Sequence, residues 1–259
     1  MHRWLMLVCA AALSACAARP PGRPAAPGVP HPPAVDLFTT ATTRCAGLTT
    51  FTAALRLSGR AGSERLRGTL LTGLAAPASV RFEAVAPFGQ PFFILAGTSG
   101  RATLLLPRDN MVLMDTPVPD VLERLTGLRL DAVDLRMLLT ACLALPASPR
   151  MGLLYGRGWQ SVVVGTDTVA YLRIIDGRPR VVAADDGEWR VDYAQYQHDW
   201  PRQVRIRSVA GDVDMIAVLE DIAVNTEIDS RAFEVTVPPG AMPITLDHLR
   251  SVVPLRAPS

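Results

Sequence analysis

The chain has 259 residues, 49% of them hydrophobic, and 26 basic side chains against 24 acidic ones, a formal net charge of +2. This length suffices for one large domain with a sizeable core. The nearly neutral balance gives no electrostatic case for nucleic acid as a partner.

Residues 1–15 have the composition of a secretion signal. His2 and Arg3 precede an apolar run over residues 4–12. A transmembrane helix needs about 20 apolar residues, so this run is too short to span a membrane and is expected to be cleaved off.

Leu13-Ser-Ala-Cys16 resembles the lipobox of bacterial lipoproteins, in which the cysteine becomes the new N-terminus. The resemblance implies diacylglycerol and a fatty acyl chain attached to Cys16. Since Ala17 follows the cysteine, it also implies an anchor in the outer membrane, on the periplasmic face. A plain signal peptide cleaved nearby is the alternative.

Residues 16–35 are expected to form a lipidated, proline-rich tether. Seven prolines fall between residues 17 and 35, and such a composition stays extended and builds no core. Two or three acyl chains give a durable anchor, because each buried methylene contributes roughly 0.8 kcal/mol. The folded domain is predicted to span residues 36–259.

Most of this domain shows period-two alternation. Val80 and Phe82 fall on one face of the segment 80–84, and Arg81 and Glu83 on the other. The same pattern, with turn residues at the joints, predicts a series of strands. These are 52–60, 64–73, 80–84, 92–97, 101–106, 111–115, 151–156, 160–166, 168–175, 179–184, 189–193, 204–208 and 212–221. We expect a mainly β fold with a few helices, a meander curling into a barrel.

Two helices are expected to interrupt the sheet and a weaker one, over 36–48, to precede it. The first begins at Thr116-Pro117 and ends at Gly127, and the second spans about 131–145. Each has an apolar stripe that must be covered. The stripes comprise Val118, Val121, Leu122 and Leu125 in the first helix and Leu135, Leu138, Leu139 and Cys142 in the second.

Two cysteines, Cys45 and Cys142, belong to the predicted domain. They can form a disulfide in the periplasm, and two separate buried thiols are the alternative. Neither has a metal-ligand neighbour at a useful spacing, so no metal site is predicted.

Sequence motifs of enzymes are missing from the chain. It contains no H-E-x-x-H, no G-x-S-x-G and no P-loop. Asp185-Asp186-Gly187 is typical of a hairpin turn, and His198 falls in a strand connection. No catalytic residue is assigned and no enzymatic activity is expected.

A concave apolar sheet with inserted helices can be filled by its own side chains or by a ligand beneath a helical lid. Periodicity alone does not separate these alternatives. Residues 80–90 resemble the strand and turn of the LolB outer-membrane lipoprotein receptor, and residues 121–146 resemble its lid-helix region. Residues 225–240 are more similar to the tail of the periplasmic carrier LolA.

The LolA/LolB-like resemblance implies an incomplete antiparallel β-barrel that encloses or is capped by helices. Its apolar cavity would hold acyl chains of lipoproteins or lipids, and Phe88 matches a loop residue that contacts the membrane. The alternative for Phe88 is packing onto Phe92 or Phe93 in the core. Implied partners are the outer membrane and a soluble periplasmic lipoprotein carrier, and a monomer is expected. The residues expected to line the cavity are Val118, Val121, Leu122, Leu125, Leu135, Leu138 and Leu139.

Two departures from the family bear on the receptor role. The second helix reads Met137-Leu-Leu-Thr-Ala-Cys-Leu-Ala-Leu145 where LolB carries a Trp and a Gly, and the extension after Gly240 has no counterpart in the receptor. A structural or assembly lipoprotein of the cell envelope, using the same barrel as a protein-binding scaffold, is therefore the alternative function. Such a scaffold needs no empty cavity.

Overall fold

The computed structural model describes residues 22–24, 27–85, 91–143 and 148–249. Its strands form one open 15-stranded sheet of order β1-β8-β9-β10-β11-β12-β13-β14-β2-β3-β4-β5-β6-β7-β15. In chain order, the first seven strands are β1 (Val29–Pro30), β2 (Thr50–Ala61), β3 (Glu64–Ala75), β4 (Ser79–Ala84), β5 (Ile94–Thr98), β6 (Arg101–Leu106) and β7 (Met111–Pro117). The remaining strands are β8 (Pro149–Leu154), β9 (Gln160–Val164), β10 (Thr168–Ile175), β11 (Arg178–Asp185), β12 (Trp189–Gln197), β13 (Trp200–Ser208), β14 (Val213–Val224) and β15 (Met242–Pro243).

Most of the sheet consists of two antiparallel meanders, β2 to β7 and β8 to β14, joined where β14 pairs with β2. At the two edges, β1 pairs antiparallel with β8 and β15 pairs parallel with β7. Val213 lies opposite Ala61 and Val224 opposite Phe51, so the last long strand returns beside the first. The sheet does not close on itself, which confirms the expectation of a mainly β, incomplete barrel with helices.

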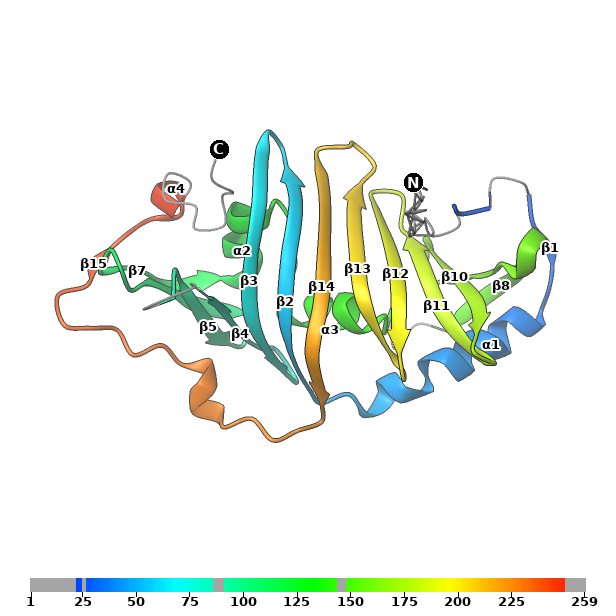
Figure 1. The fold of residues 1–259 in the computed structure, drawn as a ribbon, viewed down its shortest axis with the longest axis horizontal. Coiled ribbons are helices and arrows are strands. Elements are labelled where there is room, and N and C mark those ends of the chain that lie inside the picture. Colours follow the sequence, from blue (N-terminus) through cyan, green and yellow to red (C-terminus); the bar gives the residue numbers. More distant parts are fainter. Residues whose placement is uncertain (1–21, 25–26, 86–90, 144–147, 250–259) are drawn as a thin grey trace, which may run out of the picture.

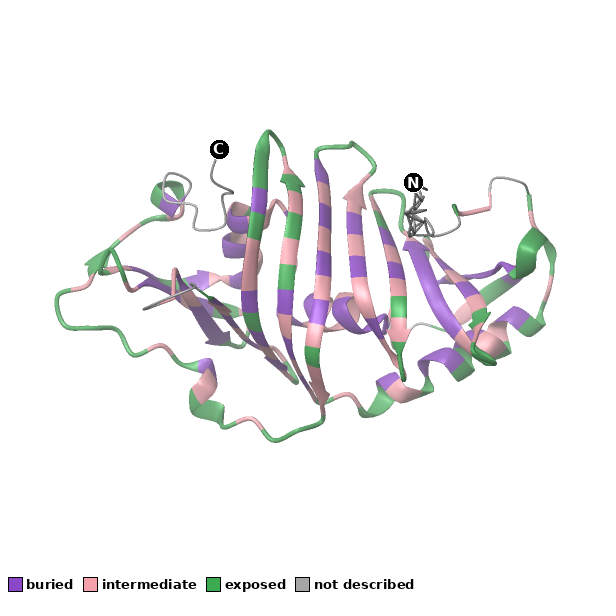
Figure 2. Cartoon of the chain, viewed as in Figure 1, coloured by how far each residue is buried: buried purple, intermediate pink, exposed green. Residues whose placement is uncertain are grey.

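The helices are α1 (Pro33–Thr42), α2 (Val118–Thr126), α3 (Ala132–Thr140) and α4 (Leu246–Leu249), with 3₁₀ turns η1 (Thr43–Gly47), η2 (Gly156–Gly158) and η3 (Ser230–Phe233). Figure 1 shows α2 and α3 against one face of the sheet and α1 below β11. Buried and less buried residues alternate along β2, β14 and β13 (Figure 2), the pattern of strands with one covered face. In the described ranges, no helix has the length and hydropathy needed to span a membrane.

Helix α2 ends as expected but begins later. Thr116, the expected N-cap, belongs to β7, and Pro117 precedes the first helical residue. Pro117 is the N-cap, and Pro119 occupies the first turn, where its ring fixes φ near the helical value and its missing N–H would have no partner within the helix. Gly127 ends the helix with φ 76°, a left-handed conformation that glycine adopts at little cost.

Helix α3 is shorter than the predicted span 131–145. The Asp131 carboxylate accepts hydrogen bonds from the N–H groups of Val133 and Asp134, both at 2.8 Å. The Asp134 carboxylate in turn accepts a bond from the Asp131 N–H at 3.0 Å. This capping box fixes the start. The helix stops because Ala141 takes a left-handed conformation, φ 55°.

Within the described residues, regular structure begins before residue 36, the predicted domain boundary. Val29 and Pro30 pair with β8, and α1 begins at Pro33, where proline is tolerated in the first turn. Ala34 and Phe38 are buried, since α1 packs over β8 and β11. The C-terminal part of the predicted tether is therefore attached to the sheet.

Candidate ligand cavity

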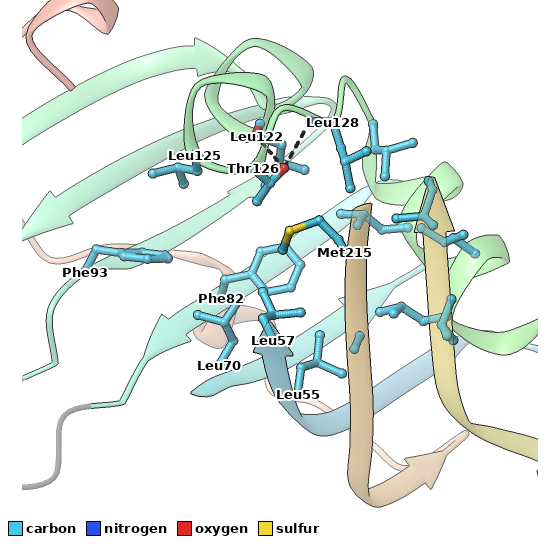
Figure 3. Close-up of a pocket in the computed structure, with 17 residues that line it drawn as sticks. Leu55, Leu57, Leu70, Phe82, Phe93, Leu122, Leu125, Thr126, Leu128 and Met215 are labelled. Atoms are coloured by element: carbon cyan, nitrogen blue, oxygen red, sulfur yellow. Dashed lines mark hydrogen bonds between the residues drawn. The ribbon is translucent and has the colours of Figure 1, made fainter. Parts of the chain in front are cut away.

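An apolar cavity of about 80 Å³ lies between the sheet and helices α2 and α3 (Figure 3). It is lined by Leu55, Leu57, Leu70, Phe82, Phe93, Leu122, Leu125, Thr126, Leu128, Leu130, Leu135, Leu138, Leu139, Val204, Ile206, Met215 and Ala217. Thr126 is the one polar residue among these, and its hydroxyl donates to the Leu122 carbonyl at 2.8 Å. The lining therefore offers dispersion contacts and no free polar group, which suits a hydrocarbon ligand.

Five of the seven residues predicted to line a cavity do so here: Leu122, Leu125, Leu135, Leu138 and Leu139. The other two, Val118 and Val121, are fully buried at 0% exposure but lie outside the lining. They occupy the first turn of α2, next to the end of β7, so their side chains fill the core at that junction.

Sequence reasoning did not name the sheet side of the cavity as a site. Phe82 and Val204 belong to predicted strands and point to the covered face, and both line the cavity. Period-two alternation identified that face, but many inward residues are ordinary core. Only the position of α2 and α3 decides which of them border the empty space.

A second space, of about 280 Å³, adjoins the first and opens to solvent. The two share Leu130, Leu138 and Ile206, which separate them. Apolar residues such as Trp189 line the second space, and its rim carries Asp134, among other carboxylates. Burial raises the pKa of the Asp134 carboxyl above its ordinary value.

Helix α3 is tied to the N-terminal helical segment at its C-terminal end. Cys45, in η1, and Cys142, just after α3, form a disulfide with a Cα–Cα distance of 5.6 Å. Arg44 donates to the Thr140 carbonyl at 3.0 Å and lies 4.9 Å from the centre of the Trp200 ring. Burial lowers the pKa of the Arg44 guanidinium. These contacts fix the C-terminal end of α3 above the sheet.

Two predicted sites lie outside the described residues: the lipid-attachment residue Cys16 and the membrane-contacting residue Phe88. In the described ranges, His, Cys, Asp and Glu side chains form no group that could hold a metal ion.

Similar folds occur among solved structures at low sequence identity. A domain assigned to outer membrane lipoprotein sorting in Vibrio parahaemolyticus is 10% identical, with a TM-score of 0.45, over 77% of this chain and 95% of that one. A LolA superfamily protein from Nitrosomonas europaea is 8% identical, with a TM-score of 0.41, over 78% and 96% of the two chains. A DUF1329 family protein from Desulfovibrio piger is 12% identical, with a TM-score of 0.48, over 77% and 95%. No family model and no curated protein matches the chain.

The open, largely antiparallel sheet curled around helices is itself the architecture that the LolA/LolB-like resemblance implied. At these identities the likeness concerns the fold alone.

Proposed function

We propose that the protein is a lipid-anchored lipoprotein of the outer membrane, facing the periplasm, that binds acyl chains non-covalently and receives lipoproteins for insertion. The observation that carries the proposal is the wholly apolar space beneath α2 and α3. The lipobox-like Leu-Ser-Ala-Cys16 supports the anchor, with two or three acyl chains on that cysteine. A soluble periplasmic carrier is the source of the lipoproteins in this proposal.

The size of the first space sets how binding occurs. About 80 Å³ is little more than half of an engineered cavity of roughly 150 Å³ that accommodates benzene. A long acyl chain therefore needs Leu138 and its neighbours to move outward and join the two spaces. Each methylene of the chain buried in the joined space then contributes roughly 0.8 kcal/mol.

Native mass spectrometry of the mature chain, carrying Cys16→Ser in place of the lipid anchor, tests this function. We expect co-purified acylated molecules, or one added diacylated lipopeptide bound per chain. Leu138→Gln places an amide in the apolar lining, at a cost of about 1–3 kcal/mol, so lipopeptide should bind about tenfold more weakly or worse.

Leu71→Gln is the matched control, since Leu71 lies on β3 with 48% of its surface exposed and should tolerate the same change. A folded protein that binds no acyl chain would contradict the proposal and favour the envelope scaffold, which does not need the cavity. A scaffold would also bind its partner unchanged in the Leu138→Gln variant.

A further inference from the structure

Arg23 clamps the N-terminal segment onto the sheet. Its guanidinium donates to the Asp185 carboxylate at 2.8 Å and to the carbonyls of Ala184 and Val191, both at 2.9 Å. It also approaches Asp192 at 3.4 Å. The side chain is only 16% exposed, so these bonds are partly shielded from water. Arginine suits this role because its planar fork donates in several fixed directions.

The clamp lies where two strands are weakly joined. β11 and β12 pair over three residues each, 183–185 and 190–192, although both strands are longer. Arg23 bonds to both members of the central pair, Ala184 and Val191. It therefore bridges β11 and β12 at this point.

The clamp also lies beside the second space. Three of the residues that bind Arg23, namely Ala184, Asp185 and Val191, line that space as well. The opening and the clamp thus belong to the same end of the sheet, where β10 begins, β11 ends and β12 begins. Figure 1 shows this end of β11 and β12 at the top of the sheet.

Chain length then limits where a lipid anchor can be. Arg23 follows Cys16 by seven positions, a stretch that reaches at most about 25 Å when fully extended. β11, with eight residues, is itself about 25 Å long. The clamped end of the sheet therefore stays within about 25 Å of the bilayer that holds the acyl chains, whereas the opposite end can lie up to about 50 Å away.

The rim at this end carries an apolar residue that fits a lipid surface. Val209, in the turn between β13 and β14, is 50% exposed and donates its N–H to the Glu188 carbonyl at 2.7 Å. The two turns, 186–188 and 209–212, thus form one continuous rim. We refer to these residues as the anchor rim.

We propose that Arg23 orients the protein on the membrane, so that the anchor rim and the opening of the second space face the lipid bilayer. The inference rests on the lipid anchor of the proposed function. It deepens that function, since an acyl chain leaving the second space at this end enters the bilayer over a short path. Arg23 is a positioning residue: it touches no ligand and acts through the direction in which the chain leaves the sheet.

The test measures which end of the sheet approaches lipid. The lipidated mature protein carries a fluorophore on the new cysteine of Glu188→Cys or of Arg178→Cys. It is bound to phosphatidylcholine vesicles that contain nitroxide-labelled lipid, which quenches a fluorophore close to the bilayer. Both positions are exposed and lie at opposite ends of β11. We expect several-fold stronger quenching at position 188. Arg23→Ala should remove the difference, and Arg23→Lys, which keeps the charge without the fork, should reduce it.

Arg56→Ala is the matched control, because Arg56 is an exposed arginine paired with Glu220 on strands remote from the clamp. It should leave the preference unchanged.

Equal quenching at positions 188 and 178, or a preference that survives Arg23→Ala, overturns the inference while acyl-chain binding still stands. Protein that does not float with the vesicles lacks the anchor, which overturns the membrane part of the proposed function and this inference together. A rim preference without acyl-chain binding in the mass-spectrometry assay leaves the orientation intact and overturns the cavity function alone.

Discussion

At the scale of single residues, the structure separates side chains that fill the core from those that border empty space. Leu104 and Leu219 are fully buried and lie outside the cavity lining, whereas Leu138 lines both spaces and is partly exposed. These leucines are equivalent in hydrophobicity, and only their surroundings distinguish them. Substitutions at such positions therefore test stability in one case and ligand binding in the other.

The ion pair between Arg180 and Asp199 should make stability depend on pH. Arg180 is 6% exposed, and its Nη1 donates to the Asp199 carboxylate at 2.7 Å. This bond lowers the pKa of the Asp199 carboxyl. A depressed carboxyl pKa stabilises the folded state above the ordinary value of about 3.9, and this contribution is lost as the pH falls through the lower, folded value.

Asp199→Asn should cost about 1 kcal/mol at pH 7, a modest figure because Asp199 is partly exposed to solvent. Urea unfolding at pH 7 and pH 3 measures the change. The variant should lose less stability on acidification than the natural chain does, because it lacks this titrating carboxyl. Asp176→Asn, in an exposed turn, is the control. If the Asp199→Asn variant and the natural chain lost the same stability between pH 7 and pH 3, the ion pair would not be the source of the acid sensitivity.

Phe88 is expected to contact lipid, and it lies outside the described residues. β4 ends at Ala84, opposite Leu70, and runs toward the end of the sheet that holds the β2–β3 turn and the anchor rim. Phe88→Glu should leave folding unchanged and reduce delivery of lipoprotein to vesicles, because burying one Phe contributes roughly 1.5–3 kcal/mol. Phe88→Leu should retain delivery. Unchanged delivery by the Glu variant would reject the contact.

At the scale of elements, the local sequence patterns predicted most strands within a few residues. β3, β6 and β10 contain or match the expected segments, because alternation and turn chemistry are properties of neighbouring residues. The boundaries of α2 and α3 were less accurate. Thr116 belongs to β7 because it pairs with Ala102 in β6. The residues next to Thr116 in the sequence contain no signal that predicts this pairing.

The disulfide between Cys45 and Cys142 links α3 to η1 across 97 residues of sequence. Closing a loop of about 100 residues stabilises the folded state by up to roughly 4.7 kcal/mol in the chain-entropy model. The double variant Cys45→Ser, Cys142→Ser should therefore unfold at markedly lower urea concentration. It should also exchange bound lipopeptide faster, since the end of the lid is released.

Reduction of the natural chain is the matched comparison for the double variant, and both should behave alike in unfolding and in lipopeptide exchange. The prediction is wrong if removing the bond leaves the urea midpoint where it was. Faster exchange without a loss of stability would assign the bond to control of the lid alone.

At the scale of the whole molecule, the seam between β14 and β2 makes one unit of two meanders. Leu219, on β14, lies opposite Leu55, on β2, and the two are 0% and 3% exposed. Leu219→Ala should cost about 2–5 kcal/mol through the cavity it leaves. Because the seam belongs to both meanders, we expect hydrogen exchange to accelerate equally in β4–β6 and in β11–β12.

Hydrogen exchange with mass spectrometry resolves these two regions. Leu71→Ala, on the exposed side of β3, should change neither. Acceleration confined to β8–β14 would show that the second meander opens by itself and that the seam does not couple the two halves.

The sequence by itself determined the kinds of element and the chemical character of their faces. Alternating apolar residues predicted strands with one covered face, and apolar stripes predicted helices that cover it, since both signals lie within a few neighbouring residues. The tertiary structure decided what is left open between them. Pairing of β14 with β2, across more than 150 residues, bends the sheet around α2 and α3 and leaves the cavity. The tertiary structure also brings Arg23 to β11 and β12, a contact over about 160 positions. Long-range packing, and not local periodicity, determines which distant segments meet.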